Sequence, residues 1–259
     1  IVKNVGLIMA TFLTTVQSQQ EKGFVTTESV LFLNQKKMNN FFKKIYYLYY
    51  RPKIFFPRKS YSMFGEDIVV NDLFEKQSYG FYVDVGCYHP LEGNNTYLLY
   101  KKNWNGINID VNPFSIELFN AARNKDININ LAVSNKKTSL KLYFRKKLNM
   151  LNTINKEFAK KNFPNGYEEK IVGADTLNSI ISNTRFKSQE IDFLNIDVEG
   201  NEENVIQSLD FELYNPKIIC VEIHDENLEE NSVKKMLTNK NYKIIWKHKY
   251  SFIFKKLDT

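Results

Sequence analysis

The stretch YVDVGCYHP at residues 82–90 decides the fold of this chain. Together with Phe81 it begins as an apolar run, which is typical of a strand buried on both faces of a parallel sheet. Gly86 follows where the strand must turn, and glycine reaches backbone conformations that other residues avoid. We therefore predict a strand over 81–87 that belongs to an open α/β sheet, with a ligand site beyond its carboxyl end.

Strands and helices alternate outward from this stretch. The apolar patterns predict further strands over 106–110, 129–134, 139–144, 193–197 and 217–224, and helices over 66–76, 95–102, 114–123, 176–182, 202–209 and 232–239. This alternation predicts an α/β fold with a doubly wound, mainly parallel sheet. The runs 242–247 and 251–255 predict a C-terminal antiparallel hairpin. We expect one domain over 61–256, in which the polar, lysine-rich segment 146–170 forms a loop or a lid.

The positive charge of the chain gathers in a basic aromatic arm at 38–60. The net charge is +7, and the arm holds no acidic residue but six basic ones: Lys43, Lys44, Arg51, Lys53, Arg58 and Lys59. One helical face carries Phe41, Phe42, Ile45, Leu48 and Tyr49, and Pro52 then ends any helix. Because aromatic stripes usually belong to a core, this favours docking on the main domain or on a second subunit. Peripheral contact with an anionic membrane surface is the alternative. No nucleic acid partner is expected. Residues 1–37 lack periodicity, and we expect a poorly ordered or non-native segment there.

Acidic residues close four of the predicted strands, where ligands of open α/β sheets bind. These strand ends carry Asp84 with Gly86, Asp110, Asp197 with Glu199, and Glu222 with His224. An acid that ends a second strand accepts hydrogen bonds from both hydroxyls of a ribose, which suits Asp110; a helix N-cap is the alternative. The chain has neither a G-x-G-x-x-G sequence nor a Walker sequence, so a pyrophosphate cradle is not specified. The pattern favours a nucleoside ligand without phosphates.

Six stretches resemble the FkbM family of methyltransferases that depend on S-adenosylmethionine (SAM). They are YSMFGED at 61–67, YVDVGCYHP at 82–90, NNTYLLYKKNWNGINIDVNP at 94–113, DTLNSII at 175–181, DFLNIDVEGNEENVIQSLDF at 192–211 and PKIICVEIH at 216–224. The resemblance implies a class I methyltransferase sheet of the Rossmann-like type, SAM as methyl donor and usually a hydroxyl acceptor. Members of the family modify polyketides, glycans and surface polysaccharides, so a small-molecule or glycan acceptor is expected. Because SAM is kept inside cells, we expect a cytoplasmic protein.

The resemblance also implies roles for individual residues. Asp84 and Gly86 would flank SAM, and Asp110 would hold its ribose. Glu66 would face the cofactor end of the site, and Asn95 and Thr96 would line the pocket. Pro90 stands where methyltransferases often carry a second glycine, which leaves the path of this loop open.

The proton acceptor for a hydroxyl substrate has several candidates. His224 and His89 are candidate bases, because an imidazole titrates near pH ~6.5. Asp197 and Glu199 are alternatives, or could instead hold a divalent cation together with Glu222. Two other function classes stay open: an oxidoreductase of the NAD type on a similar sheet, and a non-catalytic, membrane-associated scaffold.

Two smaller expectations concern the middle of the chain. Asp175 is expected to be the N-cap of the helix that follows it. If 146–170 is a lid over the acceptor, then Lys146, Lys147 and Lys170 would lie near an anionic glycan.

Overall fold

The computed structural model describes residues 40–52, 58–225 and 227–257, and the chain divides into two compact units, Ile1–Tyr50 and Arg51–Thr259. In the first unit, helix α3 (Asn40–Ile45) continues as a π-helical turn η1 (Tyr46–Tyr50), so the predicted helix before Pro52 is confirmed. The expectations for residues 1–37, and for the arm at 53–57, lie outside the described residues. Across the ranges that are described, no helix is long and apolar enough to cross a membrane.

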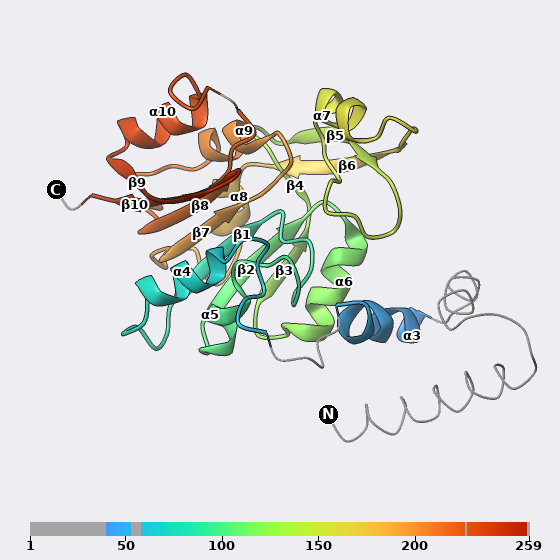
Figure 1. The fold of residues 1–259 in the computed structure, drawn as a ribbon, viewed down its shortest axis with the longest axis horizontal. Helices are drawn as coiled ribbons and strands as arrows, with labels where there is room; N and C mark the ends of the chain where they lie inside the picture. The colour runs from blue at the N-terminus through green and yellow to red at the C-terminus, as the bar shows by residue number, and fades with distance from the viewer. Residues whose placement is uncertain (1–39, 53–57, 226, 258–259) are drawn as a thin grey trace, which may run out of the picture. The chain divides into compact units, whose positions relative to one another are not determined.

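The second unit is built on a seven-stranded sheet in the order β3-β2-β1-β7-β8-β10-β9 (Figure 1). Its parallel strands are β1 (Phe81–Val85), β2 (Asn105–Asp110), β3 (Ile127–Asn130), β7 (Phe193–Ile196) and β8 (Ile218–Glu222). Strand β10 (Ser251–Lys256) runs antiparallel to both β8 and β9 (Tyr242–His248). The mainly parallel α/β sheet and the terminal hairpin are therefore as predicted, and the architecture is consistent with a methyltransferase-like fold.

Strand β1 lies in the middle of the sheet, and all five of its residues are buried. Its alternate side chains Phe81, Val83 and Val85 pack in one core cluster with residues of the C-terminal helices, whereas Tyr82 packs in a second cluster with Val70 and Leu99. Because successive side chains of a strand point to opposite faces, the two clusters lie on opposite faces of the sheet. Burial on both faces explains the continuous apolar run in the sequence.

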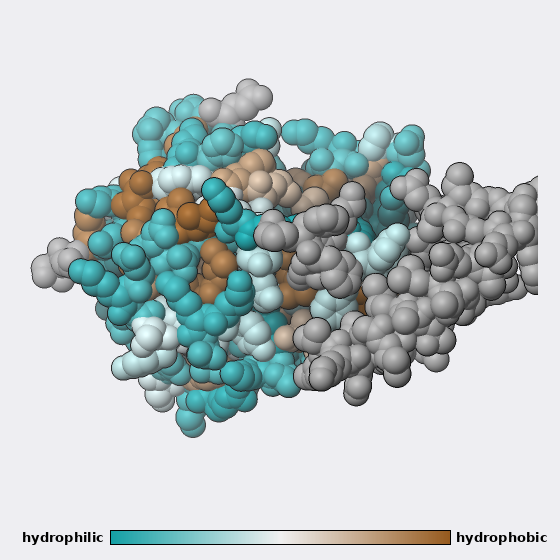
Figure 2. All heavy atoms as spheres, turned by 60° about the horizontal axis from the view of Figure 1, so that its bottom comes forward, coloured by the Kyte–Doolittle hydropathy of each residue, from teal (hydrophilic) through white to brown (hydrophobic). Residues whose placement is uncertain are grey.

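Helices follow the strands and cover the two faces (Figure 1). They are α4 (Glu66–Leu73), α5 (Tyr97–Lys101), α6 (Pro113–Ala122), α8 (Leu177–Ser182), α9 (Glu202–Gln207) and α10 (Ser232–Asn239). On the face turned forward in Figure 2, hydrophilic residues surround smaller patches of hydrophobic ones. Cys87 and Cys220 are buried free thiols.

A second, three-stranded sheet departs from the sequence-based expectation. The predicted strand 129–134 is interrupted: β3 ends in the main sheet, and β4 (Ala132–Val133) joins the small sheet of order β4-β6-β5. Strand β5 (Thr138–Phe144) pairs with β6 (Glu168–Asp175), which was not predicted. Most side chains of β6 are exposed, so it gives no hydrophobic period and depends on backbone pairing with β5. Helix α7 (Lys156–Asn162), which lies within the segment 146–170, was not predicted either.

The expected N-cap at Asp175 is wrong. Asp175 is the last residue of β6, and the N-cap of α8 is Thr176, whose Oγ1 accepts a hydrogen bond from the backbone N–H of Ser179 at 3.1 Å. The Asp175 carboxylate instead accepts from the Ser179 hydroxyl at 3.1 Å. The threonine hydroxyl thus takes over the capping bond that the acid was expected to make.

Candidate functional site

Two hollows open where the parallel strands end, and they meet at Gly86, Tyr88, Met150 and Asp197. The first, here called the Asp110 hollow, is lined by the ends of β1 and β2, by β4 and by residues 148–150 and 152–154, and encloses about 560 Å³. The second, the acidic hollow, encloses about 680 Å³ and is lined by Glu66, Asp84, Glu199 and Glu222 among others. Both hollows are open to solvent.

Asp110 presents a nearly buried carboxylate to the first hollow. Its two oxygens accept hydrogen bonds from the backbone N–H groups of Asn112 at 2.7 Å and Tyr88 at 2.8 Å. Burial raises the pKa of Asp110 to about 6. Asn112, rather than Asp110, caps helix α6, because its Oδ1 accepts from the Phe114 N–H at 3.0 Å. This excludes the N-cap alternative for Asp110 and leaves its remaining lone pairs for a ligand.

Gly86 joins two of the strand-end loops. Its φ is +81°, and an added β-carbon would lie 1.7 Å from the backbone carbonyl oxygen of Asp197. The sequence suggested that glycine lets a ligand approach the backbone. In the structure the close neighbour is the loop after β7, so the protein itself requires glycine at this position.

Asp84 is fully buried and is held by protein donors. Asn195 donates to its Oδ1 at 2.9 Å, and Thr96 and Asn94 donate to its Oδ2 at 2.8 and 3.1 Å. Burial raises the pKa of Asp84, and the charge of the buried Arg123 opposes that effect. Asp84 therefore forms the floor of the acidic hollow as the centre of an internal hydrogen-bond network.

The two residues expected to line the pocket are placed differently. Asn95 lines the acidic hollow, and its amide donates to Asn195 Oδ1 at 2.9 Å. Thr96 is fully buried, donates to Asp84 and accepts from Arg123 at 2.7 Å, and is not among the described residues that line either hollow. Thr96 thus positions Asp84 from behind.

Of the next two candidates, Glu66 lines a hollow and His89 does not. Glu66, at the start of α4, lines the acidic hollow and accepts from the Phe64 N–H at 2.8 Å and the Ser251 hydroxyl at 2.6 Å. His89 is fully buried, and its Nδ1 accepts from the Leu91 N–H at 3.1 Å. His89 is not among the described residues that line the two hollows, so the structure does not bring this candidate base to the site.

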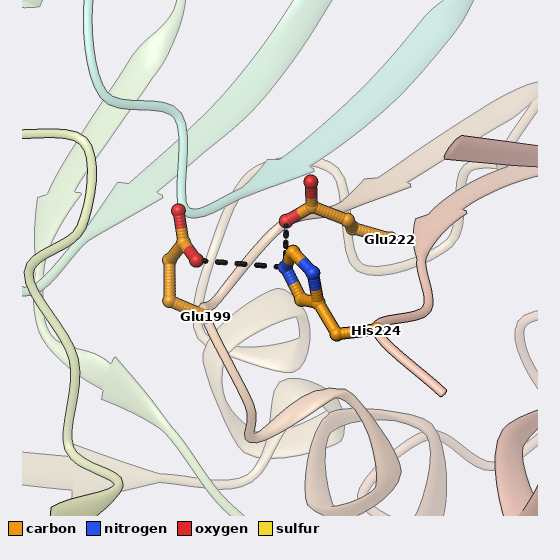
Figure 3. Close-up of side chains that lie close together, drawn as sticks. All are labelled: Glu199, Glu222 and His224. Atoms are coloured by element: carbon orange, nitrogen blue, oxygen red, sulfur yellow. Dashed lines mark hydrogen bonds and ion pairs between the residues drawn. The ribbon is translucent and has the colours of Figure 1, made fainter. Parts of the chain in front are cut away.

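His224 lies between two carboxylates at the end of the sheet (Figure 3). Its Nε2 is 2.9 Å from Glu222 Oε2 and 3.7 Å from Glu199 Oε2. Glu199 and Glu222 together raise the pKa of His224 to about 10. At neutral pH the ring is therefore an imidazolium without a free lone pair, and it serves as a base only after it has lost that proton.

Asp197 and Glu199 hold protons more strongly than isolated carboxyl groups do. Desolvation raises the pKa of Asp197 well above its ordinary range, and the charges of Glu222 and Glu199 add to the effect. Burial, followed by the charge of Glu222, also raises the pKa of Glu199, although His224 opposes this. Such shifts bring carboxyl groups toward the range in which they exchange protons near neutral pH.

Part of the segment 146–170 does cover the site. Residues 148–150 and 152–154 line the Asp110 hollow, and Met150 lines both hollows. The segment is fixed to the loop after β7 by the Thr153 hydroxyl, which donates to the Glu199 carbonyl oxygen at 2.7 Å, and by the Asn155 amide, which donates to the Gly200 carbonyl oxygen at 2.8 Å.

The three lysines of that segment lie elsewhere. Lys146, Lys147 and Lys170 line a third hollow of about 590 Å³ beside Phe114 and Phe144. This hollow shares Asn112 and Asn152 with the Asp110 hollow, but no described residue with the acidic hollow. The lysines are therefore not placed to hold an acceptor against the acids.

Several residues of the site were missed from the sequence. Asn195 is a polar residue in the middle of an apolar strand, which is a usable signal because buried amides need partners. Arg123 gave no signal, because a basic residue at the end of a helix usually faces solvent. In the structure it is fully buried and donates to Pro90, Asn94 and Thr96.

Together, the mainly parallel sheet, the strand-end acids and the joined hollows define an α/β protein with a candidate ligand site at the carboxyl edge of its sheet. The family model of the methyltransferase FkbM domain matches residues 84–252, which is more than half of the chain. The chain belongs to this family and is a methyltransferase, as the resemblance indicated. No curated protein matches the chain.

Proposed function

We propose that this protein is a SAM-dependent O-methyltransferase of class I that acts on a hydroxyl group of a sugar or glycan. The observation that carries the proposal is the meeting of the Asp110 hollow and the acidic hollow at Gly86, Tyr88, Met150 and Asp197. A donor whose nucleoside lies in the Asp110 hollow would extend its methionine part through this junction and meet an acceptor in the acidic hollow. Family membership supports the methyl transfer itself.

The residues of the Asp110 hollow fit the nucleoside part of SAM. Asp110 offers carboxylate oxygens for the two ribose hydroxyls, and the absence of a phosphate-binding sequence agrees with a ligand that has no phosphates. Asp84, Asn95 and Glu66 line the neighbouring hollow, where polar groups suit the charged methionine part. When bound, SAM supplies a methyl group activated by a sulfonium.

The residues of the acidic hollow fit a hydroxyl acceptor. In the transfer the acceptor oxygen bonds to the methyl carbon, the carbon–sulfur bond breaks with its electron pair on sulfur, and the hydroxyl proton must leave. Asp197 and Glu199 are placed to receive that proton once they are ionised, and their raised pKa values make them stronger bases than ordinary carboxylates. Alignment of the two reactants supplies the other large part of the rate.

Binding of S-adenosylhomocysteine (SAH) tests the donor. Thermal unfolding is measured with SAH and with NAD, each at up to millimolar concentration. We expect SAH alone to raise the midpoint, and Asp110→Ala to abolish that rise. An oxidoreductase would respond to NAD, and a scaffold that only kept the fold would respond to neither.

A transfer screen tests the acceptor. Labelled SAM is incubated with the protein and with sugar nucleotides, oligosaccharides and small alcohols in parallel. Recovery of the label as a methyl ether on a sugar supports the proposal. Recovery of the label only on amines or carboxyl groups would overturn the assignment to a sugar hydroxyl.

A further inference from the structure

Glu199, Glu222 and His224 place three metal-binding atoms within 4.8 Å of one another (Figure 3). The three residues come from the loop after β7, from the end of β8 and from the chain just beyond β8. Their side chains point toward one another in the acidic hollow, which Glu199 and Glu222 line. The set combines two oxygen donors and one nitrogen donor.

An independent observation at this cluster is an unsatisfied oxygen. Glu199 is 7% exposed, and its Oε2 is buried without a hydrogen bond from any residue that the structure describes. Its nearest charged neighbour, His224 Nε2, is 3.7 Å away, which is too long for a hydrogen bond. Burying a charged oxygen without a hydrogen-bond partner is costly, and such an atom in a folded protein calls for an explanation such as an absent ion.

The backbone holds Glu199 in place at a further cost. Its φ is +57°, in the left-handed region that non-glycine residues rarely adopt. The Thr153 hydroxyl donates to the carbonyl oxygen of the same residue at 2.7 Å and fixes this conformation. Residues held in such conformations concentrate at functional sites. The glutamate is therefore aimed into the cluster rather than free to turn toward water.

We propose that Glu199, Glu222 and His224 bind a divalent transition-metal cation, such as Mn²⁺, Fe²⁺, Co²⁺ or Zn²⁺. An imidazole among the ligands favours these ions over Mg²⁺ and Ca²⁺, which prefer oxygen throughout. Three protein ligands leave coordination positions open for a substrate. The site is in the acidic hollow, where the acceptor is proposed to bind. Its use in catalysis rests on the proposed function. Two neighbouring hydroxyls of a sugar would complete the coordination of the ion.

The distances agree with ligands around one ion. Ligand atoms at about 2.1 Å from a metal are roughly 3.0 Å apart at right angles and roughly 3.4 Å apart at the tetrahedral angle. The observed separations from His224 Nε2, 2.9 Å to Glu222 and 3.7 Å to Glu199, lie on either side of these values. The rings of Tyr250 and Phe158 lie 4.7 and 5.7 Å from the His224 ring and help to orient it.

Direct metal binding tests the site without any need for activity. The full chain is treated with EDTA, dialysed and titrated with Co²⁺, Zn²⁺, Mn²⁺ and Mg²⁺ by calorimetry, with the visible spectrum of the Co²⁺ form recorded in parallel. We expect one ion per chain for a transition metal and at least tenfold weaker binding of Mg²⁺. Glu199→Gln, Glu222→Gln and His224→Gln should each weaken binding at least tenfold, and His224→Gln should also change the Co²⁺ spectrum.

The control is Glu212→Gln, which alters an exposed acid and should leave metal binding unchanged. Folding is checked by thermal unfolding in EDTA, where Glu199→Gln should still unfold in one cooperative transition, because glutamine keeps the shape of the glutamate side chain. If no ion binds at up to millimolar concentration, or if the three variants bind as the parent does, the metal site is wrong. SAH binding measured on the same samples separates this failure from failure of the proposed function, because SAH binding does not require the cation.

Discussion

A β-carbon on Gly86 would lie 1.7 Å from the backbone carbonyl oxygen of Asp197. This contact brings the loop after β1, which borders the Asp110 hollow, against the loop after β7, which carries Asp197 and Glu199. At residue 86 there is room only for a hydrogen atom, and this close packing holds the two halves of the site together.

Replacing this glycine should damage both the fold and the site. Gly86→Ala places a methyl group against a backbone atom and forces a non-glycine residue to keep φ near +81°. We expect a loss of about 2–5 kcal/mol in unfolding free energy, since overpacking costs roughly 1–3 kcal/mol and the left-handed conformation roughly 1–2 kcal/mol. Urea denaturation measures this loss of unfolding free energy. The affinity for SAH should fall as well.

Gly166→Ala is the matched control. Gly166 has φ +92°, but nothing lies within 4 Å of an added β-carbon. Only the conformational cost, about 1–2 kcal/mol, is expected there. Equal losses at the two glycines would show that the contact with Asp197 does not matter.

Removing the Asp110 carboxylate should weaken SAH binding. Hydrogen bonds to a charged group contribute about 1.5–3 kcal/mol each, so Asp110→Ala should raise the dissociation constant of SAH roughly 10- to 100-fold or more. Calorimetry measures it. Asp72→Asn, at an exposed acid on α4, should change nothing. Unchanged SAH affinity in Asp110→Ala would remove this residue from the cofactor site.

The affinity for SAH should fall at acidic pH. The pKa of Asp110 is about 6 in the protein without ligand, and only the ionised form accepts hydrogen bonds from both ribose hydroxyls through both oxygens. Affinity should be level above about pH 7 and should fall by up to tenfold per unit below about pH 6. Titrations from pH 5 to 8 show this, and in Asp110→Asn the same curve should be flat.

His224 should stabilise the fold up to neutral pH and lose this effect in alkali. Its pKa is about 10 in the folded chain and about 6.5 when unfolded. A raised histidine pKa contributes fully below about pH 6.5, and the contribution disappears as pH rises through about 10. In EDTA, the gap in thermal midpoint between the parent and His224→Gln should shrink between pH 7 and pH 10.5. A constant gap would contradict the pairing with Glu199 and Glu222.

Arg123 should be a major stabilising residue although it contacts neither hollow. It is fully buried and donates to Pro90, Asn94 and Thr96, and its charge opposes those of Asp84 and Asp126. Arg123→Ala leaves these carboxylates without their cation, and breaking a buried charge pair costs about 3–5 kcal/mol. Chemical denaturation measures the loss. A cost below about 1 kcal/mol would show that Asp84 is held without it.

The sequence alone determined the centre of the main sheet, because β1, β7 and β8 are buried on both faces and therefore carry mainly apolar runs. The acids at the strand ends followed from the same pattern, since parallel strands end at one edge. Asp110 was found in this way, whereas Glu66 was expected only from the family resemblance; both line a hollow. Strand β6 and helix α7 were missed because their exposed side chains leave no period to read.

Only the tertiary structure decided which candidate residues line the hollows and which are buried behind them. His89 is closer in sequence to Asp84 than Asn95 is, and Thr96 directly follows Asn95, yet His89 and Thr96 are buried away from the walls of the hollows and Asn95 lines one. The internal role of Arg123, the contact of Gly86 with Asp197 and the meeting of Glu199, Glu222 and His224 all depend on segments far apart in the chain. Local patterns show which residues are buried or end a strand, but pKa values and unsatisfied atoms depend on distances across the fold, and these exist only once the sheet has formed.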